Sequence, residues 1–126
     1  MEKLVEENPL VAFYQEALAA AHLRRGEILL LLDKPAPAAE ALEKSLAVSR
    51  VLIDKHGVLS ASLLVRGQTF TALGRARAAA GKRDVAATQR ANAVKVFDIA
   101  LKIDPENIHQ QRGRSDAARA LGPPTK

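Results

Sequence analysis

The 126-residue chain has no cysteine and no tryptophan, and aromatic residues make up only 3% of it. Without cysteine, a disulfide framework and a cysteine-ligated zinc or iron–sulfur site are excluded. Long apolar runs are also absent. The longest purely aliphatic run is Ile28 to Leu32, far short of the roughly 20 residues that a membrane span needs. The stretch from Met1 to Glu7 is too acidic for a signal or transit peptide, so we expect a soluble, cytoplasmic protein.

Residue patterns that support catalysis or metal binding are missing as well. His22, His56 and His109 are isolated from one another, and none has the His-x-x-x-His spacing of a zinc site. The segment Gly81-Lys82-Arg83 lacks the earlier glycine and the hydroxyl residue of a phosphate-binding loop, and no serine has a Gly-x-Ser-x-Gly context. We therefore expect no enzymatic activity, no cofactor and no metal.

Alanine and leucine dominate the chain, and they recur at helical spacing between short segments that contain glycine or proline. Asp33 to Pro37 is predicted to separate the first two helices, and Asp84 is predicted to cap the fourth. The pattern predicts a single all-α domain over residues 1–126, with five helices at 10–32, 38–55, 59–80, 85–103 and 108–121.

The glycines reveal an internal repeat. Gly26, Gly74 and Gly122 are evenly spaced, since 74 − 26 and 122 − 74 both equal 48. We call this spacing the repeat period. Asn8-Pro9 and Asp104-Pro105 stand equally far before the first and the last of these glycines, so two markers agree on the register. Short helix–turn–helix units at a fixed period are typical of repeat proteins. We therefore predict repeat 1 at 8–57, repeat 2 at 58–105, a partial third repeat or capping helix at 106–122, and a disordered tail at 123–126.

These units resemble the tetratricopeptide repeat (TPR) family, in which a Leu-Gly pair on a first helix packs against small and large residues on a second. The matching positions that we assign to close helix packing are Gly26, Ala38, Leu42, Leu73, Gly74, Ala86 and Ala93. The resemblance implies a right-handed α-solenoid of about five helices in stacked hairpins. Arg77 and Arg90 replace the usual large apolar residues, and the repeat period implies longer helices than those of the shorter family repeat. A plain four-helix bundle is the alternative.

In a solenoid of this kind the resemblance implies a concave groove that holds a peptide or helix of a partner protein. Two arginines and an aliphatic floor favour a partner with acidic and apolar residues. The groove does not reproduce the Lys and Asn set with which some family members grip a C-terminal carboxylate. The predicted partner-binding residues are Leu23, Glu27, Leu30, Leu31, Gln68, Thr71, Arg75 and Arg119.

Charge is unevenly distributed. Residues 1–63 carry 7 basic and 9 acidic side chains, whereas residues 64–126 carry 12 basic and 5 acidic ones. A basic nucleic-acid-binding protein is therefore an alternative, but Phe70 and Phe97, the aromatics of the basic half, stand at core-facing positions and leave no stacking platform. We do not expect nucleic acid. The candidate phosphate contacts are Arg66, Arg75, Arg77, Lys82, Arg83, Arg90, Lys95 and Lys102.

The first predicted helix carries apolar residues around more of its circumference than one buried stripe requires, among them Phe13, Leu23 and Leu30 to Leu32. This distribution predicts an exposed surface through which the N-terminal repeat forms a homodimer. Burial of the helix in a thick core is the alternative. In a third interpretation, the chain is a structural slice of a longer repeat array, such as those behind the signalling domains of large bacterial proteins.

Overall fold

The structure, a computed structural model, describes residues 9–57 and 60–121. All regular secondary structure within these ranges is helical, so the predicted all-α class and the five predicted helices are confirmed for this part of the chain. Gly122 and the predicted tail at 123–126 lie outside the described residues. The helices are α2 (Pro9–Leu31), α3 (Pro35–His56), α4 (Ser60–Ala79), α5 (Arg83–Ile103) and α6 (Ile108–Leu121).

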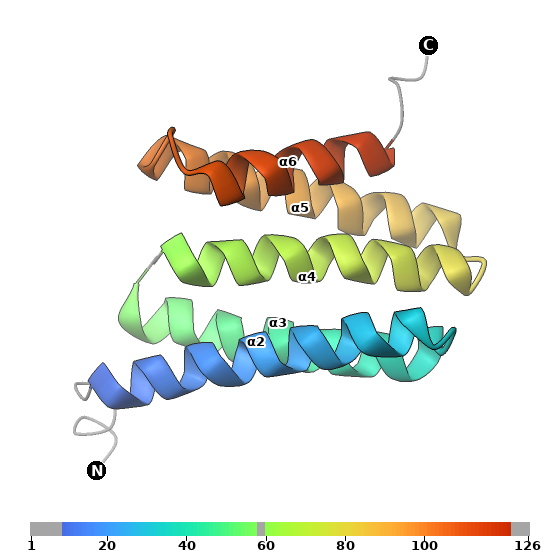
Figure 1. Ribbon diagram of the computed structural model, residues 1–126, viewed down its shortest axis with the longest axis horizontal. Coiled ribbons are helices and arrows are strands. Elements are labelled where there is room, and N and C mark those ends of the chain that lie inside the picture. Colours follow the sequence, from blue (N-terminus) through green and yellow to red (C-terminus); the bar gives the residue numbers. More distant parts are fainter. Residues whose placement is uncertain (1–8, 58–59, 122–126) are drawn as a thin grey trace.

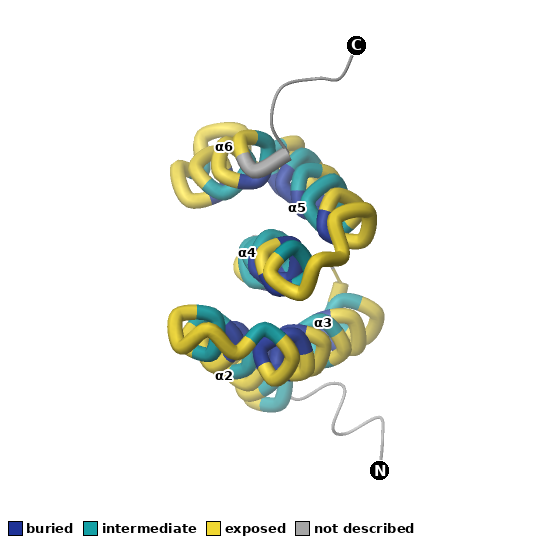
Figure 2. Tube along the Cα trace, turned by 90° about the vertical axis from the view of Figure 1, so that its right-hand side faces the viewer, coloured by how far each residue is buried: buried dark blue, intermediate teal, exposed yellow. Residues whose placement is uncertain are grey.

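Helices that are consecutive in the chain pack against one another, and α2 and α6 both also contact α4. As a result α4 lies between the α2–α3 pair and the α5–α6 pair (Figure 1). The view along the helices shows α3 and α5 on one side of the molecule and α2 and α6 on the other (Figure 2). None of the described helices combines the length and the apolar character that crossing a membrane requires.

The two hairpin turns have the same geometry. Asp33 and Gly81, which are one repeat period apart, both have a positive φ, of 59° and 81° respectively. The amide of the next residue, Lys34 or Lys82, bonds back to Leu29 O at 2.9 Å or to Arg77 O at 2.8 Å. This closure satisfies carbonyl groups that the helix end leaves free. The two hairpin turns therefore have the same closure and lie one repeat period apart.

The second helix of each hairpin begins earlier than predicted. α3 begins at Pro35 rather than residue 38, because the amides of the first helical turn have no partner within the helix and proline loses nothing there. α5 begins at Arg83, so the prediction that Asp84 is its cap is wrong. Asp84 instead lies in the first turn, where its negative charge faces the positive end of the helix dipole.

Gly26 and Gly74 allow the two helices of each hairpin to approach closely. A methyl group on Gly26 would lie 2.5 Å from Leu42 Cγ and 3.3 Å from the carbonyl oxygen of Ala38. A methyl group on Gly74 would meet Arg90 Cγ at 2.7 Å and the carbonyl oxygen of Ala86 at 3.3 Å. The predicted antiparallel pairing of Gly26 with Ala38 and Leu42 is therefore confirmed. The second hairpin repeats it one repeat period later, with an arginine stem in place of leucine.

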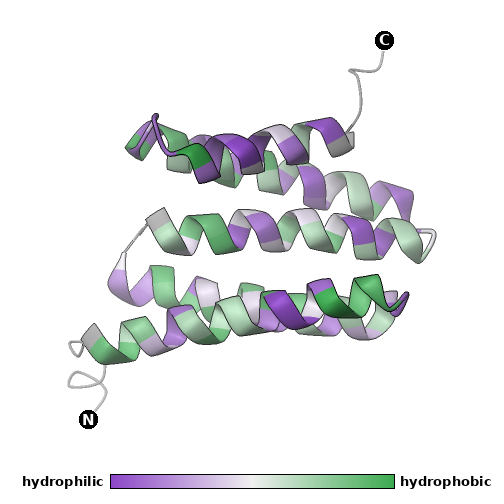
Figure 3. Ribbon diagram, viewed as in Figure 1, coloured by the Kyte–Doolittle hydropathy of each residue, from purple (hydrophilic) through white to green (hydrophobic). Residues whose placement is uncertain are grey.

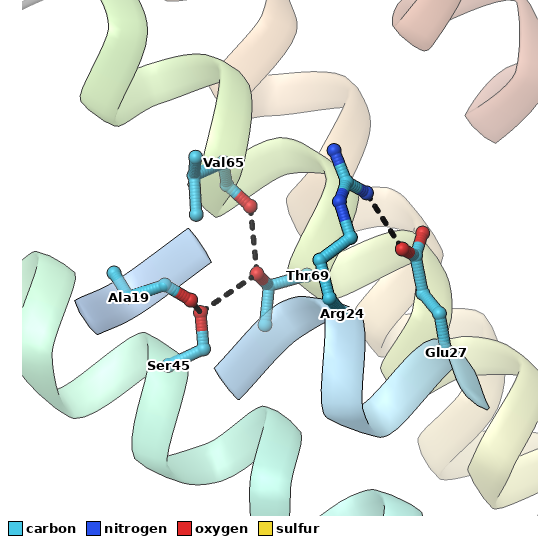
Figure 4. A network of polar contacts seen from close by, with 6 residues as sticks. All are labelled: Ala19, Arg24, Glu27, Ser45, Val65 and Thr69. Atoms are coloured by element: carbon cyan, nitrogen blue, oxygen red, sulfur yellow. Dashed lines mark hydrogen bonds and ion pairs between the residues drawn. The ribbon is translucent and has the colours of Figure 1, made fainter. Parts of the chain in front are cut away.

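Three helices meet at each of two joints. In the first joint, between α2, α3 and α4, the buried hydroxyl group of Ser45 donates to Ala19 O at 2.8 Å and lies 3.1 Å from Thr69 Oγ1 (Figure 4). Thr69 in turn donates to Val65 O at 2.6 Å. Each hydroxyl group has one proton, so two of these three contacts are hydrogen bonds at any one time, and the Ser45–Thr69 pair links α2, α3 and α4.

In the second joint, between α4, α5 and α6, the positions that correspond to Ser45 and Thr69 are apolar. Ala93 and Ala117, which stand one repeat period after Ser45 and Thr69, are fully buried beside the ring of Phe97. Gly67 and Gly113 face this ring so closely that a methyl group on either would overlap it. The same three-helix arrangement is therefore filled by hydroxyl groups in one joint and by a phenyl ring in the other.

Candidate partner-binding groove

Four of the predicted partner-binding residues lie together. Glu27 of α2 and Gln68, Thr71 and Arg75 of α4 line one hollow of about 430 Å³. Because α2 and α4 run in the same direction (Figure 1), side chains spaced by three or four residues on each helix face the same side. The α5 ring of Phe97 also contributes to the lining. The hollow thus combines side chains from both repeats.

Helix α6 supplies the opposite wall of this hollow, which the sequence interpretation did not include apart from Arg119. His109, Arg112, Gly113 and Asp116 line it, whereas Arg119 is exposed and does not. A signal for this wall was present in the repeat, because Asp116 stands one repeat period after Gln68. When the predicted groove positions of α4 are continued by one more repeat period, they fall on α6.

The charges in the hollow are not all equally available. Glu27 accepts an ion-pair contact from Arg24 Nη1 at 2.7 Å, which is shown in Figure 4. Among the described residues, neither Arg75 nor Arg112 forms an ion pair, and Asp116 is the remaining carboxylate of the lining. The lining therefore contains two arginines and one carboxylate that form no ion pair, and this excess of positive charge favours a ligand with a negatively charged group.

The predicted leucine floor of the groove is wrong at Leu23. Leu23 is fully buried and packs with Leu42 and Leu73 in the core of the first joint. Leu30 is half-buried against the same core, and Leu31 is 86% exposed but does not line the hollow. The physical reason is helical geometry. Ala19, Leu23 and Leu30 lie on one stripe of α2, and this stripe faces α3 and α4 rather than the groove.

The residues assigned to close packing all occupy buried positions. The two glycines form the close contacts described above, and the other members have at most 1% of their surface exposed. They are Gly26, Ala38, Leu42, Leu73, Gly74, Ala86 and Ala93.

Several basic residues that the nucleic-acid alternative requires are engaged within the protein. Arg66 Nη1 donates to Ser49 Oγ at 3.0 Å, and its guanidinium lies 5.3 Å from the ring centre of Phe70. Burial lowers the pKa of Arg66, nearby Arg50 lowers it further, and Asp54 acts in the opposite direction. Arg77 pairs with Glu43, and the Arg90 stem covers Gly74.

The remaining basic residues of that set are exposed: Arg75, Lys82, Arg83, Lys95 and Lys102. Phe97 is fully buried and Phe70 is half-buried in the core, as predicted. The ring of Phe97 therefore offers no face on which a base could stack, and the guanidinium of Arg66 lies over the ring of Phe70.

A separate apolar surface covers the outer side of α2. Leu18 and Ile28 are exposed on this side, and so is the ring of Tyr14 near the start of the helix. Figure 3 shows hydrophobic turns at both ends of α2 and a hydrophilic segment between them. We call this surface the outer face of α2; its large exposed hydrophobic residues are Leu10, Tyr14, Leu18, Ile28 and Leu31.

Comparisons of the chain with protein-family models, with curated proteins and with solved structures give no significant match. Over residues 9–57 and 60–121, no group of three or more histidine, aspartate or glutamate side chains is placed to hold a metal ion. The functional interpretation therefore depends on the groove, its charges and the exposed apolar surfaces.

Proposed function

We propose that the protein is a non-enzymatic interaction scaffold that binds a segment of a partner protein in the groove over α2, α4 and α6. The observation that carries the proposal is the meeting of Glu27, Gln68, Thr71 and Arg75 in one hollow. These four are among the eight residues that the sequence predicts for the groove, independently of any contact between them. The alternative of an unrelated bundle gives no reason for them to share a concave surface.

A TPR-like right-handed solenoid is the architecture that we propose for this scaffold. Its support is the correspondence between the two hairpins at the repeat period, in the glycine contacts and in the turns at Asp33 and Gly81. In such a stack the first helices of successive hairpins line one concave surface. Here those helices are α2, α4 and α6, which all contribute residues to the hollow.

The partner segment that we propose carries a carboxylate and an apolar side chain. Arg75 and Arg112 are the groups for the carboxylate, since a guanidinium binds a carboxylate through two parallel hydrogen bonds. Leu23 is buried in the core, so the apolar contact must come from other residues of the groove. Charged contacts then set the register of the segment, and apolar contacts supply most of the affinity.

Selection from a displayed peptide library, followed by titration at two salt concentrations, tests this function. The scaffold is expected to select peptides whose binding weakens only modestly when the salt concentration is raised severalfold. Single-stranded and duplex oligonucleotides serve as the comparison, because phosphate binding through several cations falls steeply with salt. Submicromolar, steeply salt-dependent oligonucleotide binding without any peptide selection would replace this function with the nucleic-acid alternative.

We also propose that two copies of the chain associate through the outer face of α2. Support comes from Ile28, which is 55% exposed, and from the other large hydrophobic side chains of that face. In the second hairpin the residue one repeat period later, Ala76, is buried against the first. At this position, the surface of α4 that corresponds to the outer face of α2 is thus covered by the first hairpin, whereas the outer face of α2 is exposed.

A further inference from the structure

A second hollow, of about 230 Å³, lies between the first halves of α2 and α4, with α3 as its floor. Its walls are small side chains, Ala17 and Ala20 from α2 and Ala61 and Val65 from α4. Ser49 and Leu52, both almost fully buried, form the floor. We call this hollow the alanine pocket. An apolar cavity of about 150 Å³ is enough to bind benzene, so the alanine pocket can hold an aromatic ring.

The second joint shows what this chain places at the corresponding site. Ala19, Ser49 and Val65 of the alanine pocket stand one repeat period before Gly67, Phe97 and Gly113. In the second joint the chain supplies its own phenyl ring, and the two glycines make room for it. In the first joint the ring is replaced by a serine, and a hollow remains between α2 and α4. The first joint therefore has space for a ring from outside the chain.

Two further features define the chemistry of the occupant. The ring of Phe13 lines the pocket and is 69% exposed, so it can pack edge-to-face with an incoming ring. Among the described residues, Glu16 is the one charged member of the lining, and its carboxylate accepts a hydrogen bond from Ser62 at 3.3 Å. A carboxylate at the edge of an apolar pocket favours a ligand that places a positive charge beside its apolar group.

We propose that the alanine pocket binds an aromatic side chain of the partner segment, with a lysine or arginine next to it that pairs with Glu16. This inference rests on the proposed function and supplies the apolar anchor that Leu23 cannot provide. Ala17 in the pocket and Glu27 in the charged hollow are ten residues apart on α2, or about 15 Å at 1.5 Å per residue. An extended segment covers that distance with about four or five residues. The partner therefore carries its aromatic–cationic pair about that far from its acidic residue.

NMR titration with phenethylammonium, a ring with a positive charge, tests the pocket by itself. The methyl signals of Ala17, Ala20 and Ala61 are expected to shift, and 3-phenylpropionate, with the same ring and a negative charge, is expected to bind at least about threefold more weakly. Glu16→Gln should remove this preference, and Glu40→Gln, at an exposed position on α3 outside the alanine pocket, should keep it. Equal binding of the two probes, or no shift of these methyl signals, would overturn the inference.

A pair of variants on one helix tests the occupancy of the pocket. Ala17 and Ala21 are both exposed residues of α2, and Ala17 lines the pocket whereas Ala21 does not. Ala17→Leu is expected to weaken binding of phenethylammonium and of selected peptides at least about tenfold, and Ala21→Leu to leave both unchanged. Unfolding curves of the two variants verify that they remain folded.

The same titrations separate this inference from the function on which it rests. If Arg75→Glu abolishes peptide binding while Ala17→Leu leaves peptide and probe binding unchanged, the pocket is not the anchor site and the proposed function stands. If phenethylammonium binds in the pocket but no peptide binds the protein, the proposed function and the polypeptide occupant are both wrong. Peptides selected by the protein should also contain an aromatic residue beside a lysine or arginine, and their absence would overturn the inference.

Discussion

Gly26 and Gly74 occupy corresponding positions, but the side chains above them differ in stiffness. The Leu42 side chain above Gly26 is fully buried, and its branch atom lies where an added methyl group would come. Above Gly74, the atom in the way is Cγ of Arg90, and this side chain is partly exposed and so has more room to move than the buried Leu42. The same added methyl group should therefore cost different amounts of free energy at the two positions.

Gly26→Ala is expected to lower the free energy of unfolding by about 1 to 3 kcal/mol, because the buried leucine must leave its rotamer or push the helices apart. Gly74→Ala is expected to change it by less than about 1 kcal/mol, since alanine gains up to about 1 kcal/mol of helix propensity and offsets the displacement of Arg90. Urea unfolding of the two variants measures both values. A loss at Gly74 as large as that at Gly26 would show that Arg90 is as rigid as Leu42.

At the residue scale, the packing glycines could be predicted because close helix approach requires small residues at a fixed spacing. The burial of Leu23 could not, since α2 is apolar around much of its circumference and spacing alone does not tell which stripe meets α3. The alanine pocket was also hidden. Alanine occurs throughout this chain, and only the placement of Ala17 opposite Ala61 makes a hollow of it.

Helix α6 packs against α4 and α5, and its most crowded contact is with the ring of Phe97. The ring of Phe97 lies between Gly67 of α4 and Gly113 of α6, and a side chain on either glycine would overlap it. On α6 itself, Ala117 is fully buried against the same ring. The absence of a side chain at Gly113 therefore contributes to the attachment of α6, together with the ion pair between Arg114 and Asp98.

Gly113→Ala is expected to loosen α6 selectively, because an aromatic ring held on two sides cannot move aside as an arginine stem can. Amide hydrogen exchange should become faster in α6 and in the adjoining part of α5, while the α2–α3 hairpin keeps its protection. Ser115→Ala, an exposed change on the same helix, is the control. Unchanged exchange in the Gly113→Ala protein would show that α6 is not held through the Phe97 ring.

At the element scale, the ends of the helices were easier to predict than their beginnings. Asp33 and Gly81 end α2 and α4 through left-handed residues, for which the sequence has a recognisable signal. The beginnings of α3 and α5 have no side-chain cap. The sequence prediction assigns Pro35 to the segment between two helices and Asp84 to a cap, so it starts both helices too late. The wall of the groove on α6 was missed because its polar residues were interpreted as a solvated cap.

For the whole molecule, the outer face of α2 predicts self-association. The protein is expected to sediment as a dimer at tens of micromolar, because the large exposed hydrophobic side chains at the two ends of α2 mark an interaction site. Ile28→Glu or Leu31→Glu should yield a monomer without loss of helical content. Leu23→Glu is unsuitable for this test, since Leu23 is buried in the core. Ile99→Glu, at a half-exposed position on α5, is the control. A wild-type protein that sediments as a monomer would contradict the dimer.

At this scale the all-α class followed from the sequence, because the apolar residues recur at helical spacing, and four of the eight predicted groove residues lie together in the hollow. The depth and charge of the groove did not follow. They depend on how closely α6 approaches α4, and on the pairing of Glu27 with Arg24, which are tertiary contacts.

Affinity of a selected peptide for two charge-reversal variants tests the groove most directly. Arg75 lines the charged hollow, and Arg83 is an exposed arginine at the start of α5 that does not line it. Both substitutions to glutamate change the net charge equally, so they separate a local contact from general electrostatic attraction. We predict that Arg75→Glu weakens binding at least about tenfold, which corresponds to about 1.4 kcal/mol, and that Arg83→Glu changes it by less than about twofold. Equal losses in the two variants would place the partner outside the groove.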